Sequence, residues 1–260
     1  MANWLKRLLA PRQATSAETR ICTVSFTNMV GYVGIAEHMS LDHLPIFMNR
    51  YFEVIGTAIH SRNGTIDKYI GDVVEAFWWQ PMGAQLACES ALDQMQAMSE
   101  FHAWATENGY PSPPIRIGIN TGSMRIGEFG TRYHSNYTVM GDHVNLASRL
   151  EGINKEYGTR ILISESTRKR LSKDMVVRQI DRVRVKGKDD PLGLFELVCR
   201  ASELPPWQAG FLEVYGQGFS QYFAQDFTGA LKSFERAEKI SPGDGPSRVL
   251  ASRCRELIQH

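Results

Sequence analysis

The chain has 260 residues, of which 43% are hydrophobic and 22% are charged, and its formal net charge is +1. A chain of this length can bury a full hydrophobic core, so we expect one main domain with a small appendage. The nearly neutral charge argues against a general nucleic-acid-binding protein, which carries a concentrated basic surface.

The cysteines and the lengths of the apolar runs indicate in which cellular compartment the protein is expected. The four cysteines are far apart in the chain, at Cys22, Cys88, Cys199 and Cys254. This spacing matches neither a zinc site nor a disulfide framework, and reduced thiols predict a cytoplasmic protein. We expect no transmembrane segment, because no apolar run approaches the roughly 20 residues that span a bilayer. Residues 1–19 are interpreted as a leader or linker. The alternative is that residues 1–10, which Pro11 follows, form a short basic amphipathic turn that lies on a membrane surface.

The first half of the chain predicts both helices and strands. In order, they are a strand at 21–26, a glycine-containing turn at 28–34, a helix between Ser40 and Asn63, strands at 65–70 and 73–78, and a helix at 84–104. Apolar residues at three- and four-residue steps indicate the first helix. The two strands form a hairpin around Gly71-Asp72, which presents the aspartate at its tip.

The second half continues this alternation after the prolines at 111–114. The predicted elements are a strand at 115–119, a helix at 144–157, a strand at 160–163, a helix at 164–171, and strands at 176–185 and 192–198. Gly158 stands where a residue commonly ends a helix. The order predicts an α+β fold with a ferredoxin-like βαββαβ core and an αββ extension, a sandwich with helices on one face. Such a fold alone names no function.

The pattern changes to helix after Leu204-Pro205-Pro206, so we place a main domain at 20–200 and a helical tail at 205–260. Residues of the tail have the spacing of a single tetratricopeptide repeat, at Gly218, Phe227, Ala230, Phe234, Ala237 and Pro242. A third helix follows at 248–258. A lone repeat cannot bury its own faces, so the tail packs on the main domain, on a second copy or on a partner protein. A plain helical tail that only stabilises the fold is the alternative.

Four segments carry the candidate chemistry. They are Phe26-Thr27-Asn28-Met29-Val30-Gly31-Tyr32, Asp67-Lys68-Tyr69-Ile70-Gly71-Asp72, the run from Tyr137 to Arg149, and Val185-Lys186-Gly187-Lys188. With these segments the main domain resembles the catalytic domain of class III nucleotidyl cyclases, which convert ATP or GTP into a cyclic monophosphate. Diguanylate cyclases share the topology, but the chain has no Gly-Gly-(Asp/Glu)-Glu-Phe segment.

The resemblance implies a site for two divalent ions, Mg²⁺ or Mn²⁺, which bridge the triphosphate and activate the ribose 3′-hydroxyl. Asp72 matches the second metal-binding aspartate, and the backbone of Met29 lies beside the first. Asn28 occupies the place of that first aspartate. An amide oxygen still ligates a hard cation, but it lacks the negative charge, so the affinity for metal should fall.

The resemblance also implies which residues bind the nucleotide. Lys68 matches the base-reading position, where lysine indicates adenine, and Thr138 matches its companion, so ATP is the expected substrate. Gly31 and Tyr32 lie in the first motif and are expected to contact substrate. Lys186 resembles the lysine that grips the terminal phosphates, with Lys188 as a nearby competitor.

Asn145 and Arg149 lie four residues apart on one face of a predicted helix. In the family the asparagine orients the ribose and the arginine stabilises the pentavalent phosphorus. Because each family active site combines residues of two chains, the resemblance implies a homodimer with shared sites.

Two functions remain open from the sequence. One is an adenylate cyclase weakened by Asn28, and the other is a degenerate cyclase-like module that binds nucleotide or only dimerises. Glu75 is a second departure from the family pattern. It is a poor substitute for the lost carboxylate, because strand alternation places residues 72 and 75 on opposite faces.

Overall fold

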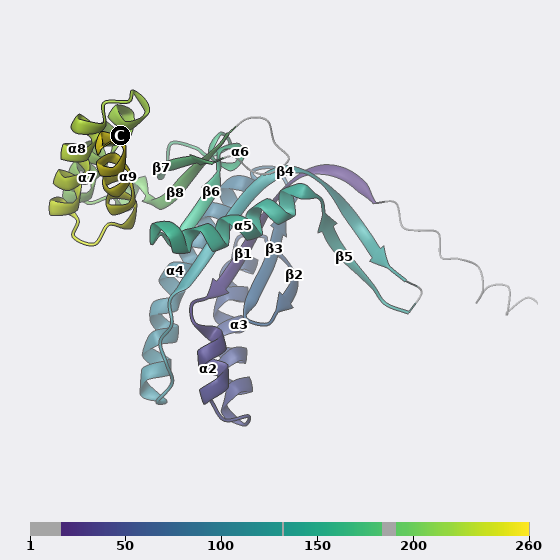
Figure 1. Cartoon of the computed structure of the whole chain (residues 1–260). Coiled ribbons are helices and arrows are strands. Elements are labelled where there is room, and N and C mark those ends of the chain that lie inside the picture. The colour runs from purple at the N-terminus through teal and green to yellow at the C-terminus, as the bar shows by residue number, and fades with distance from the viewer. Residues whose placement is uncertain (1–16, 132, 184–190, 260) are drawn as a thin grey trace, which may run out of the picture.

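A mixed eight-stranded sheet forms the centre of the computed structural model, which describes residues 17–131, 133–183 and 191–259 (Figure 1). The strands run in the order β2-β3-β1-β4-β6-β8-β7, and β5 pairs with β4 beside this path. Their bounds are β1 Glu18–Met29, β2 Thr65–Ile70, β3 Val73–Trp78, β4 Ile115–Gly130, β5 Ser135–Met140, β6 Ile161–Ser164, β7 Met175–Val183 and β8 Leu192–Arg200.

Helices cover both faces of this sheet. Their bounds are α2 Tyr32–His38, α3 His43–Ser61, α4 Gly83–Glu107, α5 Asp142–Tyr157, α6 Glu165–Arg168, α7 Pro206–Phe223, α8 Phe227–Ile240 and α9 Gly245–Gln259. The predicted ferredoxin-like core and its extension are confirmed in outline. The expectation that the helices share one face was wrong, because α5 crosses the face opposite to α3 and α4 (Figure 1).

Alternation along the central strands produces the two faces. Ile117 and Ile119 of β4 pack into the core with α3 and α4. The neighbouring Gly118 points the other way, towards α5. A Cβ at Gly118 would lie 2.2 Å from the backbone nitrogen of Glu151, so only glycine lets α5 approach the sheet this closely.

The hairpin β2–β3 has the predicted bounds, and Lys68 pairs with Glu75 across it. Gly71 has a φ of 62°, the left-handed conformation that glycine adopts without steric cost. A bulge between Ile66 and Lys68 shifts the register of β2. Because of this bulge, the side chain of Asp67 is fully buried while that of the adjacent Lys68 stays 41% exposed.

Several elements differ from their predicted bounds. Strand β1 is longer than 21–26 at both ends and continues to Met29, and helix α2 begins at Tyr32, so only residues 30–31 remain of the turn predicted at 28–34. The strand predicted at 115–119 continues to Gly130, where it pairs with the unpredicted β5. Together β4 and β5 form an arm that projects from the body of the domain (Figure 1). Polar residues outnumber apolar ones in 128–137, which removed the hydrophobic signal that indicates a strand.

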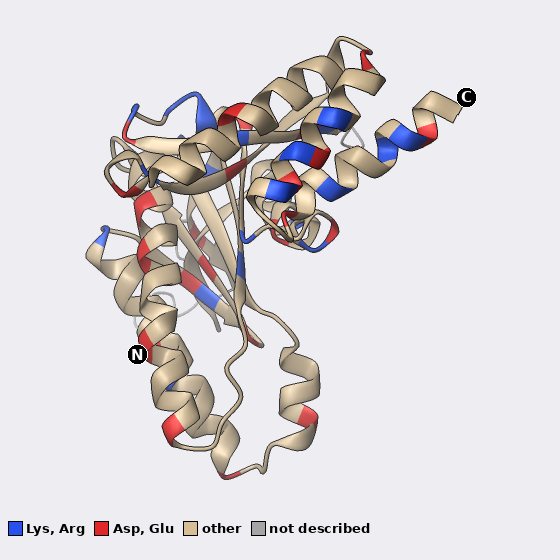
Figure 2. Cartoon of the chain, turned by 90° about the vertical axis from the view of Figure 1, so that its left-hand side faces the viewer, with Lys and Arg blue, Asp and Glu red and all other residues tan. Residues whose placement is uncertain are grey.

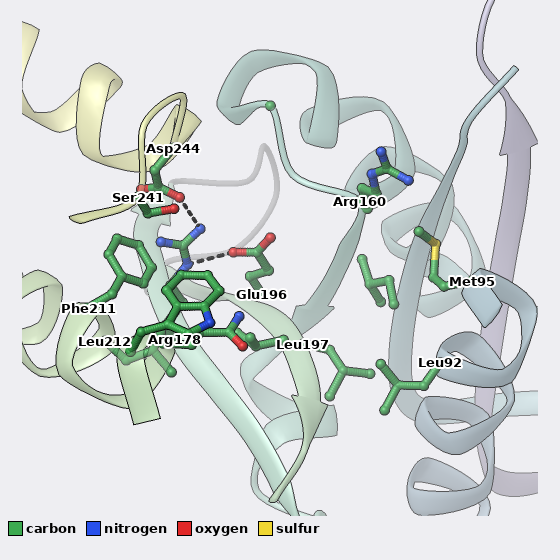
Figure 3. Close-up of a pocket in the computed structure, with 15 residues that line it drawn as sticks. Leu92, Met95, Arg160, Arg178, Glu196, Leu197, Phe211, Leu212, Ser241 and Asp244 are labelled. Carbon is green, nitrogen blue, oxygen red and sulfur yellow. Dashed lines mark hydrogen bonds and ion pairs between the residues drawn. The ribbon is translucent and has the colours of Figure 1, made fainter. Parts of the chain in front are cut away.

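The tail folds as three helices with their own core, built on Tyr215, Phe234 and Leu250. This tail packs on the main domain, the first of the three expected arrangements. Arg178 of β7 bonds Glu196 of β8 at 2.6 Å and Asp244 of the tail at 2.6 Å, as Figure 3 shows. A cavity of about 350 Å³ lies at this junction, and none of its lining residues belongs to the nucleotide motifs.

The described residues show how charge is distributed over the tail and how apolar the helices are. Figure 2 shows basic and acidic positions interspersed over the tail helices rather than gathered in a basic stripe. Among the residues that the structure describes, no helix combines the length and the apolar character needed to cross a bilayer. The four cysteines are unpaired thiols. A cytoplasmic location stays a prediction.

Candidate nucleotide-binding site

Two predicted base-reading residues converge on one carboxylate. The hydroxyl of Thr138 on β5 donates a hydrogen bond to Oδ2 of Asp67 at 2.6 Å. The ammonium of Lys68 lies 3.0 Å from the same oxygen. Residues separated by 70 positions in the chain therefore meet, because the arm formed by β4 and β5 brings Thr138 over the hairpin.

Glu75 adds a second carboxylate to this cluster. Its Oε2 lies 3.7 Å from Nζ of Lys68, and the residue is only 4% exposed. Burial first, and then the charge of the adjacent Asp67, raise the pKa of Glu75 to about 7, while Lys68 acts in the opposite direction. Glu75 therefore interacts with Lys68 and Asp67, and no contact among the described residues joins it to Asp72. That Glu75 does not substitute for a carboxylate at position 28 stays a prediction.

The hairpin tip meets the end of β1 at a second cluster. The backbone N–H of Met29 donates to Oδ2 of Asp72 at 3.0 Å. Burial raises the pKa of Asp72, while this N–H and the charge of Arg116 act in the opposite direction. The segment with Asn28 and Met29 is therefore placed beside Asp72, as the motifs predicted.

Asn28 stands opposite Arg116 in the β1–β4 register, so both residues share one face of the sheet. Nε of Arg116 bonds Oε1 of Glu151 on α5 at 3.1 Å. Burial raises the pKa of Glu151, which Arg116 lowers and Asp72 raises. Near Asn28, the positive charge of Arg116 is therefore accompanied by the carboxylates of Glu151 and Asp72.

The donor atoms at this second cluster suit a hard cation. Asp72 offers a carboxylate, Asn28 an amide oxygen and Met29 a backbone carbonyl, and oxygen donors are the ligands that Mg²⁺ and Mn²⁺ prefer. No group of three or more His, Cys, Asp or Glu side chains suited to a metal occurs in the described part of the chain. The set therefore fits an ion that takes its remaining oxygens from a bound triphosphate, as Mg²⁺ commonly does.

Gly31 and Tyr32 lie next to the same cluster. Gly31 has a φ of 80° and precedes the first residue of α2. A Cβ at Gly71 would lie 4.0 Å from Cε1 of Tyr32, so the tyrosine ring stands beside the hairpin tip. The structure brings these two predicted substrate contacts together with Asp72.

The remaining predicted residues lie outside the two clusters around Asp67 and Asp72. Asn145 and Arg149 are both exposed and lie on α5, which confirms their shared helix. Lys186, with its competitor Lys188, lies outside the described residues, as does most of the leader. The predicted residues therefore fall into three groups. The base cluster contains Lys68 and Thr138 with Asp67, the hairpin-tip cluster contains Asp72 with the segment 28–32, and the exposed face of α5 carries Asn145 and Arg149.

A sequence model of the adenylate and guanylate cyclase catalytic domain matches residues 14–196. This match covers both clusters and α5. The chain belongs to this family.

Curated relatives of this cyclase domain agree. The chain is 36% identical over 189 residues to an adenylate cyclase of Anabaena cylindrica, covering 70% of this chain and 38% of the relative. It is 34% identical over 193 residues to adenylate cyclase 1 of Rhizobium meliloti, covering 72% of this chain and 29% of the relative. The chain thus spans well under half the length of these relatives.

Solved cyclase structures share the fold. The adenylyl cyclase CyaB from P. aeruginosa superposes with a TM-score of 0.63 at 28% identity, over 73% of this chain and 100% of that one. The guanylyl cyclase Cya2 superposes with a TM-score of 0.64 at 25% identity, over 72% of this chain and 96% of that one. The family match ends before the tail, whose likeness to a tetratricopeptide repeat stays a prediction.

Sequence reasoning assigned no role to Asp67, Arg116 or Glu151 in this cyclase domain. Asp67 is the first residue of the motif segment 67–72, but its hydrogen-bond partner Thr138 lies 71 positions later in the chain. Arg116 and Glu151 lie 35 positions apart and pair only when α5 packs on β4. An alternating strand that carries one arginine among isoleucines, Ile115-Arg116-Ile117, was the available signal for the first of them.

Proposed function

We propose that this chain is an adenylyl cyclase that converts ATP into 3′,5′-cyclic AMP and pyrophosphate. The observation that supports this proposal most directly is the convergence of Lys68 and Thr138 on Asp67, which builds a base-reading pair. The relatives that carry the name adenylate cyclase, at 34% and 36% identity, favour the same substrate.

The base cluster suits adenine. An ammonium donates hydrogen bonds and never accepts them, so Lys68 fits the acceptor ring nitrogen of adenine. Guanine presents an N–H at the corresponding ring position, which a lysine cannot satisfy. The proposed substrate is therefore ATP rather than GTP.

The chemical step forms one bond and breaks one. The ribose 3′-oxygen attacks the α-phosphorus in line, the bond from that phosphorus to the bridging oxygen breaks, and pyrophosphate leaves with its electron pair. The hydroxyl proton passes to water. Asp72, the amide of Asn28 and the carbonyl of Met29 would hold Mg²⁺ or Mn²⁺, which when bound neutralises charge on the attacking and leaving oxygens.

Side chains of this chain act on the same step. Arg149 carries a fixed positive charge that stabilises the negative charge on the five-coordinate phosphorus. Asn145 is one helical turn away on α5 and orients the ribose by hydrogen bonds. Lys186 holds the terminal phosphates.

Two copies of the chain are needed in this proposal. Asn145 and Arg149 are exposed, so they are available to a nucleotide held against a second copy. A symmetric pair forms two equivalent sites, each with the hairpin tip of one copy and the base cluster of the other. The exposed Tyr69, Ile70 and Met140 near these clusters supply apolar surface for such a contact.

The test is cyclic AMP formation by the purified chain with ATP and Mn²⁺. We expect turnover that Arg149→Ala lowers by about a hundredfold or more. Lys173→Ala, an exposed position between α6 and β7, is the matched control and should leave the rate unchanged. Equal rates for both variants would contradict the proposal.

Asn28 favours a second candidate, a nucleotide-binding module without turnover. The amide removes a negative charge from the position where an ion is expected, which weakens metal-assisted chemistry most. This candidate predicts that calorimetry detects ATP binding to a chain that forms no cyclic AMP, and that Asn28→Asp creates activity. Turnover by the unchanged chain would exclude it.

A further inference from the structure

The contact between Thr138 and Asp67 has a fixed polarity. An ionised carboxylate accepts hydrogen bonds and donates none, so the proton in this contact comes from the threonine hydroxyl. Among the residues that the structure describes, the other acceptor for that proton is the backbone carbonyl of Val139 at 3.5 Å, and a hydrogen bond of this length is far weaker than one of 2.6 Å. The hydroxyl proton of Thr138 is therefore committed to Asp67.

This commitment leaves the Thr138 oxygen with lone pairs only. A free threonine hydroxyl rotates and either donates or accepts, so by itself it satisfies the 6-amino group of adenine and the 6-oxo group of guanine equally. Once its proton points at Asp67, the oxygen can only accept. It then fits an amino group and repels a carbonyl.

Lys68 supplies the hydrogen-bond donor that accompanies the acceptor oxygen of Thr138. Its ammonium is a donor and lies 3.0 Å from the carboxylate oxygen that orients Thr138. One donor and one acceptor, side by side, complement the ring nitrogen and the 6-amino group of adenine. Guanine presents the reverse order at both positions.

Burial makes this orientation stable. The side chain of Asp67 is fully buried, its Oδ1 has no hydrogen-bond partner in the described structure, and Thr138 is 4% exposed. Water therefore does not compete for the hydroxyl proton as it would at a surface. The side chain of Lys68 is 41% exposed, so its ammonium is accessible to an entering base.

We infer that Asp67 is a positioning residue that selects adenine by holding the Thr138 hydroxyl as a hydrogen-bond acceptor. This inference rests on the proposed function, because it concerns the base-reading part of the same site. Asp67 acts through Thr138 and Lys68 and does not contact the nucleotide itself.

The test compares ATP with purine riboside 5′-triphosphate, which lacks only the 6-amino group. For the unchanged chain we expect tighter binding and higher kcat/KM with ATP, by about fivefold to tenfold, the value of one buried hydrogen bond. Thr138→Val should remove this difference. Asp67→Asn should reduce it to less than about twofold, because an amide also donates and frees the hydroxyl to turn.

A second pair of variants controls for packing, because glutamate and glutamine side chains at position 67 have the same length and differ only in hydrogen-bonding character. Asp67→Glu keeps an acceptor-only group and should keep most of the preference for ATP, whereas Asp67→Gln should lose it. This pair serves if Asp67→Asn does not fold, which thermal unfolding would show. GTP is measured alongside, and its relative kcat/KM should rise in Asp67→Asn and Asp67→Gln.

The outcomes separate this inference from the proposed function. An unchanged preference for ATP in Asp67→Asn, with a lost preference in Thr138→Val, overturns the role of Asp67. An equal loss for both nucleotides also overturns it, since that is the effect of a merely structural residue. If calorimetry detects no binding of any of the three nucleotides to the unchanged chain, the proposed function fails and this inference fails with it.

Discussion

The backbone N–H of Met29 and the carboxylate of Asp72 are joined by a hydrogen bond of 3.0 Å. It connects the end of β1 to the tip of the β2–β3 hairpin, 43 positions later in the chain. Asn28 directly precedes Met29, so this bond brings the backbone segment that carries Asn28 to the hairpin tip at Asp72. The family resemblance implies a carboxylate at position 28, so the proposed metal site would carry an amide there instead.

Restoring that carboxylate should strengthen metal binding. We expect Asn28→Asp to lower the Mn²⁺ concentration needed for half-maximal cyclic AMP formation by about tenfold or more, because the number of charged ligands sets affinity for hard cations. The measurement is a metal titration at saturating ATP. Arg116 lies across the register and would offset part of the added charge. An unchanged titration curve would show that position 28 does not ligate the ion.

Glu75 should make stability depend on pH. Burial raises its pKa from 4.5 to about 7, so the folded state keeps a proton that the unfolded state releases between these values. The free energy of unfolding therefore falls as pH rises from 4.5 to about 7, by on the order of 3 kcal/mol, and is then constant with respect to this group. Urea denaturation at several pH values measures it.

Glu75→Gln should abolish that slope, because the amide does not titrate. Glu107→Gln is the matched control, since Glu107 is an exposed glutamate at the end of α4. It should leave the slope as it is in the unchanged chain. If Glu75→Gln and Glu107→Gln give the same pH dependence, Glu75 does not carry this proton.

Exchanging the base-reading lysine should change the preferred purine. Lys68→Glu replaces a donor with an acceptor, which suits the ring N–H of guanine. On its own it would place three acids together with Asp67 and Glu75, so it is best combined with Glu75→Gln. We expect the ratio of kcat/KM for ATP to that for GTP to fall by roughly a hundredfold. A ratio that stays at its original value in an active double variant would refute the assignment of Lys68.

The contact between tail and main domain should be sensitive to Arg178. Arg178→Met leaves Glu196 and Asp244 buried without their cation, which should cost about 3–5 kcal/mol of unfolding free energy. Arg255→Met is the control, because Arg255 and its partner Glu235 are 53% and 45% exposed and such a pair contributes less than about 1 kcal/mol. Equal losses in urea denaturation would mean that Arg178 does not anchor the tail.

Local patterns were sufficient for much of the fold and for the identity of many candidate residues. The hairpin at 65–70 and 73–78 was predicted with its observed bounds, because β-branched and aromatic residues flank a Gly-Asp turn. Gly158 ends α5 in the left-handed conformation, as expected. Predictions failed where the signal was weak, as at β5, whose polar residues belong to an arm rather than to a buried strand.

From the sequence alone one could determine which residue types the site contains, with Lys68, Thr138 and Asp72 recognised by their motifs. Only the tertiary structure decided which of them meet, and it added Asp67 as the common partner of Lys68 and Thr138. The reason is physical: periodicity and turn chemistry act between neighbours in the chain, whereas a hydrogen bond between β2 and β5 depends on how a long strand folds back over a hairpin. The packing of the tail against β7 was likewise decided by buried charges that meet only in three dimensions.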